Sequence, residues 1–183
     1  MTTKEKSTQR HTTTAKSVPA QLATVTDLTS EEVQAITNGL NPLIADAFAL
    51  YVKTKNFHWH LSGSHFRDYH LLFDKQAKDI FKSIDLMAER VRRIGGTTIR
   101  SIGQIAQMQT ISDDNEDFVP AGTMVKRLME DNTHMAQMLR AVVQIADKNH
   151  DRATASVLED LLDQAERRKW FLFEIVQGKD NAN

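Results

Sequence analysis

The chain has 183 residues, of which 40% are hydrophobic and 26% are charged, so it is long enough for one well-packed domain and too short for two large ones. It contains no cysteine, which excludes disulfides, thiolate catalysis and thiolate zinc sites and leaves His, Asp and Glu as the strong metal ligands. No stretch approaches the roughly 18 apolar residues of a transmembrane helix, and the N-terminus lacks an apolar secretory core. We therefore expect a cytoplasmic protein with no membrane partner.

The total charge of −1 hides an uneven distribution. Residues 1–25 are rich in Thr, Ser and Lys and have no apolar period, so we expect a flexible arm. Four basic side chains and one acidic one give this arm a charge of +3, which leaves −4 on the rest of the chain. The arm is either a solubilising tail or a non-specific DNA-binding segment that contacts phosphates. Its basic residues are Lys4, Lys6, Arg10 and Lys16.

Apolar residues then recur at helical spacing through residues 26–178, ahead of a short tail at 179–183. Gly39 and Pro42 interrupt the first apolar run, and predict a kink or a restart of the helix there. Four long helices with a short one in the middle connection predict an all-α four-helix bundle. In chain order, the expected helices cover residues 30–61, 65–94, 101–109, 120–148 and the stretch between a turn at 148–151 and Gly178.

The second long helix carries four potential metal ligands, separated by steps of four, eleven and four residues. At roughly 100° per residue, all four fall within a sector about 100° wide, so they share one face of the helix. A solvated polar face is the simpler interpretation of either pair alone. The four residues are His70, Asp74, Asp85 and Glu89.

The distance between the two pairs decides how they could act together. Asp74 and Asp85 lie roughly 16 Å apart along the axis at ~1.5 Å per residue. Metal ligands approach to ~2 Å, and a dinuclear centre spans only ~3.5–4 Å. One helix therefore cannot wrap both pairs around one centre, whereas two antiparallel copies related by a two-fold axis form two equivalent sites. Phe81 and Ala77 could pack at that axis.

A conventional di-iron bundle places its site inside one subunit and uses Glu-x-x-His pairs. The sequence contains no Glu-x-x-His pair, and Glu130 with His134 has the wrong spacing and no second copy. This absence disfavours an oxygenase that acts on an organic substrate in an intrasubunit pocket.

The segment 53–63 (KTKNFHWHLSG), followed by Tyr69-His70, Asp74 and the segment 85–90 (DLMAER), resembles the signature of the Dps family of mini-ferritins. The resemblance implies a ferritin-like fold over about residues 28–177 and a shell of twelve subunits. It also implies a di-iron ferroxidase centre shared between two subunits. By this resemblance, the site comprises His58, Trp59, His70 and Asp74 of one subunit with Asp85 and Glu89 of the other.

The resemblance further implies that paired ferrous ions are oxidised, preferably by hydrogen peroxide, and that ferric mineral is stored inside the shell while DNA is protected. The protein would then be nucleoid-associated if its arms bind DNA. The sequence departs from the family pattern at Leu71, where family members commonly have Glu, so mineral nucleation would depend on other acidic residues. The rival hypothesis is a DNA-compacting structural shell with a vestigial metal site.

Overall fold

The computed structural model describes residues 18–177, and all regular structure in this range is helical. This confirms the all-α prediction. None of the helices in the described range is long and apolar enough to cross a bilayer. In chain order, the helices are η1 (Ala20–Leu22), α1 (Ser30–His60), α2 (Phe66–Arg93), α3 (Ile102–Met108), α4 (Ala121–Lys148) and α5 (Arg152–Gln177).

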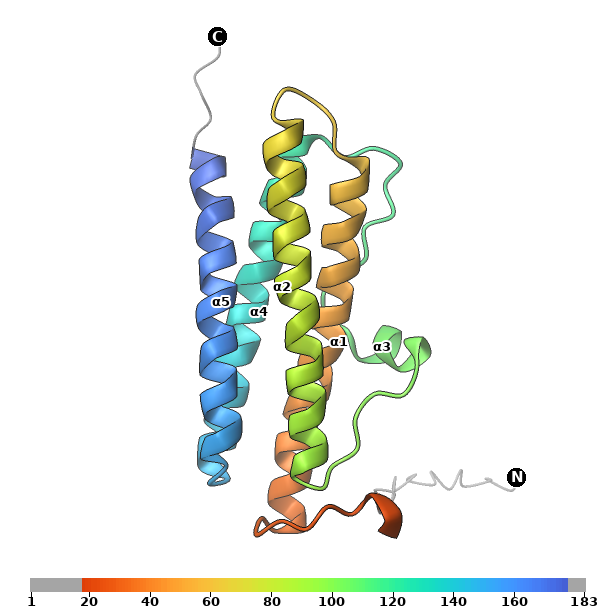
Figure 1. Ribbon diagram of the computed structural model, residues 1–183, viewed down its shortest axis with the longest axis vertical. Helices are drawn as coiled ribbons and strands as arrows, with labels where there is room; N and C mark the ends of the chain where they lie inside the picture. The colour runs from red at the N-terminus through yellow and green to blue at the C-terminus, as the bar shows by residue number, and fades with distance from the viewer. Residues whose placement is uncertain (1–17, 178–183) are drawn as a thin grey trace, which may run out of the picture.

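The four long helices form two antiparallel hairpins joined by a long crossover (Figure 1). α1 packs on α2, α4 packs on α5, and α1 also contacts α4, whereas α2 touches α5 only sparsely. The crossover climbs along α1 from the end of α2 to the start of α4, so α2 and α4 run in the same direction (Figure 1). The structure is the four-helix bundle that the sequence predicts, with α3 in its middle connection.

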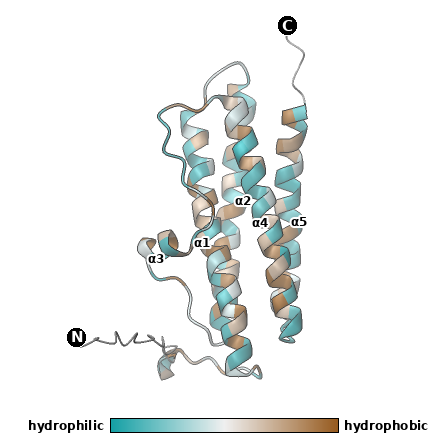
Figure 2. Cartoon of the chain, turned by 180° about the vertical axis from the view of Figure 1, so that it is seen from behind, coloured by the Kyte–Doolittle hydropathy of each residue, from teal (hydrophilic) through white to brown (hydrophobic). Residues whose placement is uncertain are grey.

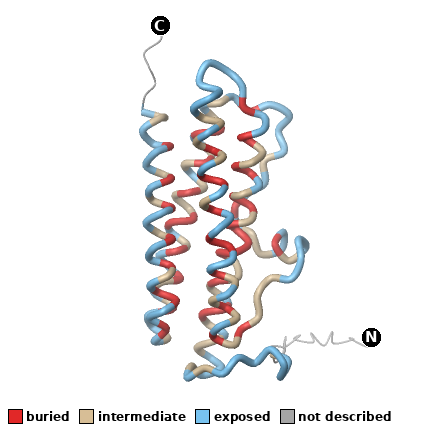
Figure 3. The backbone as a smooth tube through the Cα atoms, in the orientation of Figure 1, coloured by how far each residue is buried: buried red, intermediate tan, exposed pale blue. Residues whose placement is uncertain are grey.

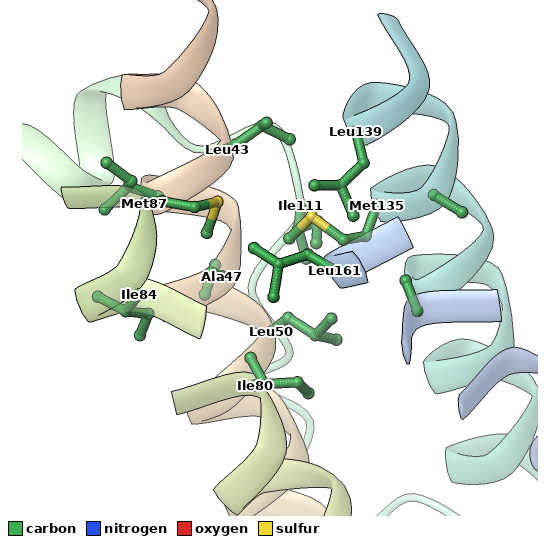
Figure 4. Close-up of a cluster of buried hydrophobic side chains, with 14 of the residues drawn as sticks. Leu43, Ala47, Leu50, Ile80, Ile84, Met87, Ile111, Met135, Leu139 and Leu161 are labelled. Atoms are coloured by element: carbon green, nitrogen blue, oxygen red, sulfur yellow. The ribbon is translucent and has the colours of Figure 1, made fainter. Parts of the chain in front are cut away.

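The core lies along the axis of the bundle. Each long helix interleaves hydrophobic and hydrophilic residues (Figure 2), and its buried positions face inward (Figure 3). Figure 4 shows Leu43 and Leu50 of α1 and Ile80 of α2 pointing toward Met135 and Leu139 of α4. All five side chains are at most 3% exposed. Burial of these amphipathic faces, at about 25 cal/mol per Å2, is the main stabilising term.

The first helix does not restart at Pro42, because α1 is continuous from Ser30 to His60. Gly39 does not interrupt the helix but allows α1 to pack closely on α4. A Cβ at this position would lie 3.0 Å from Cγ1 of Val142 on α4, so glycine permits the close approach of α1 and α4. Leu40 and Leu43, both fully buried, hold the two sides of the proline in the core.

The crossover is fastened to α1 by polar side chains rather than by a strand or a disulfide. The carboxylate of Asp46 is fully buried and accepts hydrogen bonds from the backbone N–H groups of Thr110 (2.5 Å) and Ile111 (2.9 Å) and from the Thr110 hydroxyl (2.7 Å). Further along α1, the Asn56 amide donates to the Asp114 carbonyl at 3.1 Å. These bonds keep the crossover on α1 and leave the outer face of α2 uncovered.

Candidate metal centre

Two histidines meet where α1 turns into α2, at the upper end of the bundle in Figure 1. The chain reverses between them through Gly63, which has a φ of 114°, a conformation that favours glycine. The rings of His58 and His70 stack with centroids 3.7 Å apart. Phe66, one turn before His70, stacks on its ring at 5.0 Å.

Reciprocal hydrogen bonds determine which ring nitrogen each histidine leaves available. Nδ1 of His58 lies 2.9 Å from the His70 carbonyl oxygen, and Nδ1 of His70 lies 3.0 Å from the His58 carbonyl oxygen. A carbonyl oxygen can only accept, so in the neutral imidazoles each Nδ1 carries the proton. Each Nε2 therefore keeps its lone pair for a metal ion, the arrangement by which backbone carbonyls commonly orient metal-binding histidines.

Asp74 lies one helical turn beyond His70 and is held by two ammonium groups. Lys78 lies 2.6 Å from one carboxylate oxygen and Lys55 of α1 lies 3.0 Å from the other. Hydrogen bonds from Lys78 and Lys55 lower the pKa of Asp74 to about 2. The carboxylate is therefore anionic at neutral pH and only partly exposed, as a ligand for a hard cation requires.

Asp85 and Glu89 lie on the same helix toward its other end and are both exposed. Glu89 forms an ion pair with Arg93, while Asp85 has no ion-pair partner among residues 18–177. Asp85 also lines an open, largely apolar hollow of about 640 Å3, together with Phe81 and Leu86, which are 53% and 48% exposed. A second surface would have to cover these aromatic and aliphatic side chains to remove them from water.

The structure brings part of the expected site together. His58 of α1 stacks on His70 of α2, and Asp74 lies one turn beyond His70, but nowhere in the described chain do three His, Asp or Glu side chains form a group that could hold a metal ion. Trp59 stands beside His58 with 63% of its surface exposed, and the ammonium of Lys55 lies 5.7 Å from its ring centroid.

Two other expectations concern Ala77 and the basic N-terminal arm. Ala77 is fully buried in the subunit core, so it does not contribute to the surface around Phe81 as expected. The basic residues of the proposed DNA-binding arm, Lys4, Lys6, Arg10 and Lys16, lie outside the described residues.

Sequence reasoning missed the residues that surround the ligands. The pairing of Lys78 with Asp74 is an i,i+4 contact and could have been read from spacing on the helix. Lys55 and Phe66 could not, because their contacts depend on how α1 folds back onto α2.

Comparison with known proteins agrees with this architecture. A model of the ferritin-like domain matches residues 37–179. A low temperature-induced protein of Nostoc sp. is 35% identical over 153 residues, which is 83% of this chain and 86% of the relative. DNA protection during starvation protein 1 of Deinococcus radiodurans is 30% identical over 152 residues, which is 83% of this chain and 73% of that protein.

Solved structures extend the agreement to three dimensions. The crystal structure of a Dps protein from Bacillus brevis matches with a TM-score of 0.78 and 28% identity, over 81% of this chain and 99% of that one. The chain belongs to the Dps family of mini-ferritins, and its four-helix bundle is a ferritin-like domain.

Proposed function

We propose that this protein is a ferroxidase that oxidises ferrous iron at sites shared between two subunits, and that it stores the ferric product inside a closed shell of twelve subunits. One observation carries the proposal. α2 carries the candidate ligands His70 and Asp74 near one end and the exposed Asp85 and Glu89 toward the other, on one face of an unbroken helix, and neither pair forms a metal-binding group within the described subunit.

Two antiparallel copies of α2 would join the complementary sets. His58, His70 and Asp74 of one subunit would then face Asp85 and Glu89 of the other, with Phe81 and Leu86 buried in the contact. An isologous dimer repeats every contact, so it forms two such sites. Burial of the exposed apolar side chains on α2 would provide the driving force for association.

The donor set fits iron as the substrate. Neutral imidazole nitrogens and carboxylates bind ferrous iron, and hard carboxylate oxygens suit the ferric product. The reciprocal carbonyl bonds leave both Nε2 atoms without a proton, and Lys55 and Lys78 would balance the charge of Asp74 until iron displaces them. Two ferrous ions supply two electrons, which reduce one hydrogen peroxide to two hydroxide ions.

Iron oxidation is tested with isosteric variants that remove a ligand charge and keep its shape. Asp74→Asn or Glu89→Gln should slow ferric absorbance growth at least tenfold after peroxide is added to anaerobic ferrous protein. Asp160→Asn, an exposed carboxylate on α5, is the matched control and should oxidise iron at the wild-type rate. Wild-type rates in the ligand variants, with intact shells, would refute the assignment and favour a structural shell with a vestigial site.

DNA protection is the second part of the proposal. It is supported by the basic composition of residues 1–20 and by the net negative charge of the remainder. The D. radiodurans relative is, in addition, a protein named for DNA protection during starvation. Multiple arms on one shell would bind DNA phosphates multivalently. Deletion of residues 1–20 should abolish retardation of DNA in a gel and leave iron oxidation unchanged. If the truncated shell retards DNA equally, another surface must bind it.

A further inference from the structure

A second polar site lies in the groove between α2 and α5. A hollow of about 350 Å3 there is lined by charged and amide side chains and by one aromatic ring. At ~100° per residue, its α2 residues lie outside the sector that carries the proposed iron ligands, so the groove is on a different face of α2. The lining includes Lys75, Gln76 and Asp79 of α2 and Arg167, Arg168 and Phe171 of α5.

Among the residues described, Arg168 is a buried cation that forms no salt bridge, although the nearby charge of Asp79 partly stabilises it. It is 9% exposed, and burial lowers its pKa to about 10, so it remains charged at neutral pH. Its Nε donates to Oδ1 of Asn132 at 2.8 Å, and among the residues described its two terminal nitrogens have no hydrogen-bond partner. The nearby carboxylate of Asp79 is already paired with Lys75 at 2.8 Å. A buried guanidinium without a carboxylate is costly, and an anion in the hollow would offset that cost.

The groove also presents acceptors. Gln76 is 4% exposed; its Nε2 donates to the Arg168 carbonyl oxygen at 3.4 Å, and its buried Oε1 has no hydrogen-bond partner within residues 18–177. The Asp79 carboxylate can accept as well. The groove therefore offers three cationic donors, Lys75, Arg167 and Arg168, and two acceptors, Gln76 and Asp79. This combination matches an anion that also has a hydrogen-bond donor of its own. Hydrogenphosphate has this pattern at neutral pH, since it has one P–OH donor. Sulfate and the phosphodiesters of nucleic acids have no such donor.

We propose that the groove between α2 and α5 is a binding site for inorganic phosphate, one per subunit and separate from the iron site. Arg168 would donate hydrogen bonds from the floor of the groove, Lys75 and Arg167 would contact the anion from the rim, and Gln76 would accept a hydrogen bond from the P–OH group of the bound hydrogenphosphate. This goes beyond the proposed iron oxidation and does not depend on it.

The test is equilibrium dialysis of the iron-free, full-length assembly with labelled phosphate. Saturable binding of about one phosphate per subunit is expected, with sulfate at least tenfold weaker. Because Lys75 and Arg167 are exposed, the double variant Lys75→Gln/Arg167→Gln should fold normally and weaken phosphate binding at least tenfold. Lys126→Gln, an exposed lysine on α4, is the control for loss of a surface charge and should leave binding unchanged.

A third variant tests the proton-bearing anion directly. Gln76→Leu should reduce the preference for phosphate over sulfate, because it removes an acceptor without changing charge. Absence of saturable binding at millimolar phosphate would overturn the proposal. So would equal affinity for sulfate in the wild type, or a double variant that binds phosphate as well as the Lys126→Gln control.

Discussion

The proposed shared iron site makes a quantitative prediction for mixed assemblies. His70→Ala destroys the histidine half of a site, and Glu89→Ala destroys the carboxylate half. Since the two halves lie on one continuous helix and Asp74 and Asp85 are separated by roughly 16 Å at ~1.5 Å per residue, each half serves a different site. Assemblies of either variant alone should therefore lose rapid oxidation, because every site lacks one half.

Co-assembly of the two variants should restore part of the activity. An intact site needs its histidine half from a Glu89→Ala subunit and its carboxylate half from a His70→Ala subunit. In a random equal mixture, about one quarter of the sites of isologous dimers meet both conditions. Rapid ferrous oxidation should then return with an amplitude of about one quarter of wild type. An intrasubunit site predicts no recovery in any mixture.

The assay requires both variants in the same shell, so the two should carry different affinity tags and be co-expressed and purified through both. Stopped-flow absorbance of ferric product at limiting iron then gives the amplitude of the rapid phase. Mixing the two separately assembled variants is the control and should give no rapid phase. Doubly tagged shells with no rapid phase would refute the shared arrangement.

Three further predictions concern stability and assembly. Asp46→Ala should destabilise the subunit by about 2–3 kcal/mol, measured by urea unfolding, because it leaves the buried N–H group of Ile111 and the partly buried N–H group of Thr110 without acceptors. An unchanged unfolding midpoint would contradict this. The pKa of Asp74 is lowered from 3.8 to about 2. The ionised carboxylate therefore stabilises the fold above pH 3.8, and this contribution is lost as the pH falls toward 2. Asp74→Asn should abolish the fall in the free energy of unfolding between these two pH values that Asp74 causes. Phe81→Glu should shift sedimentation toward smaller species, since it places a charge on the apolar surface of α2; intact shells would argue against that contact.

Several features of the fold follow from local sequence patterns alone. Helical periodicity located all four long helices within a few residues, because an amphipathic helix must repeat its apolar positions every three to four residues. Ser101 caps the short α3 by accepting from the Gln104 N–H, and Gly95 ends α2 with a φ of 86°. The spacing on α2 likewise separates its candidate ligands into two sets, since axial rise is a property of the helix itself.

Other features depend on contacts between helices, which no local sequence pattern specifies. Gly39 and Pro42 predicted a kink or a restart of the first helix. The helix is continuous instead, and Gly39 permits the close packing of α1 on α4. The reciprocal bonds of His58 with His70 arise only when α1 folds back onto α2. Arg168 appears in sequence as one charge on an amphipathic helix. Its burial without a salt bridge in the described part of the chain depends on how α5 lies beside α2, because burial and pairing are properties of the assembled bundle.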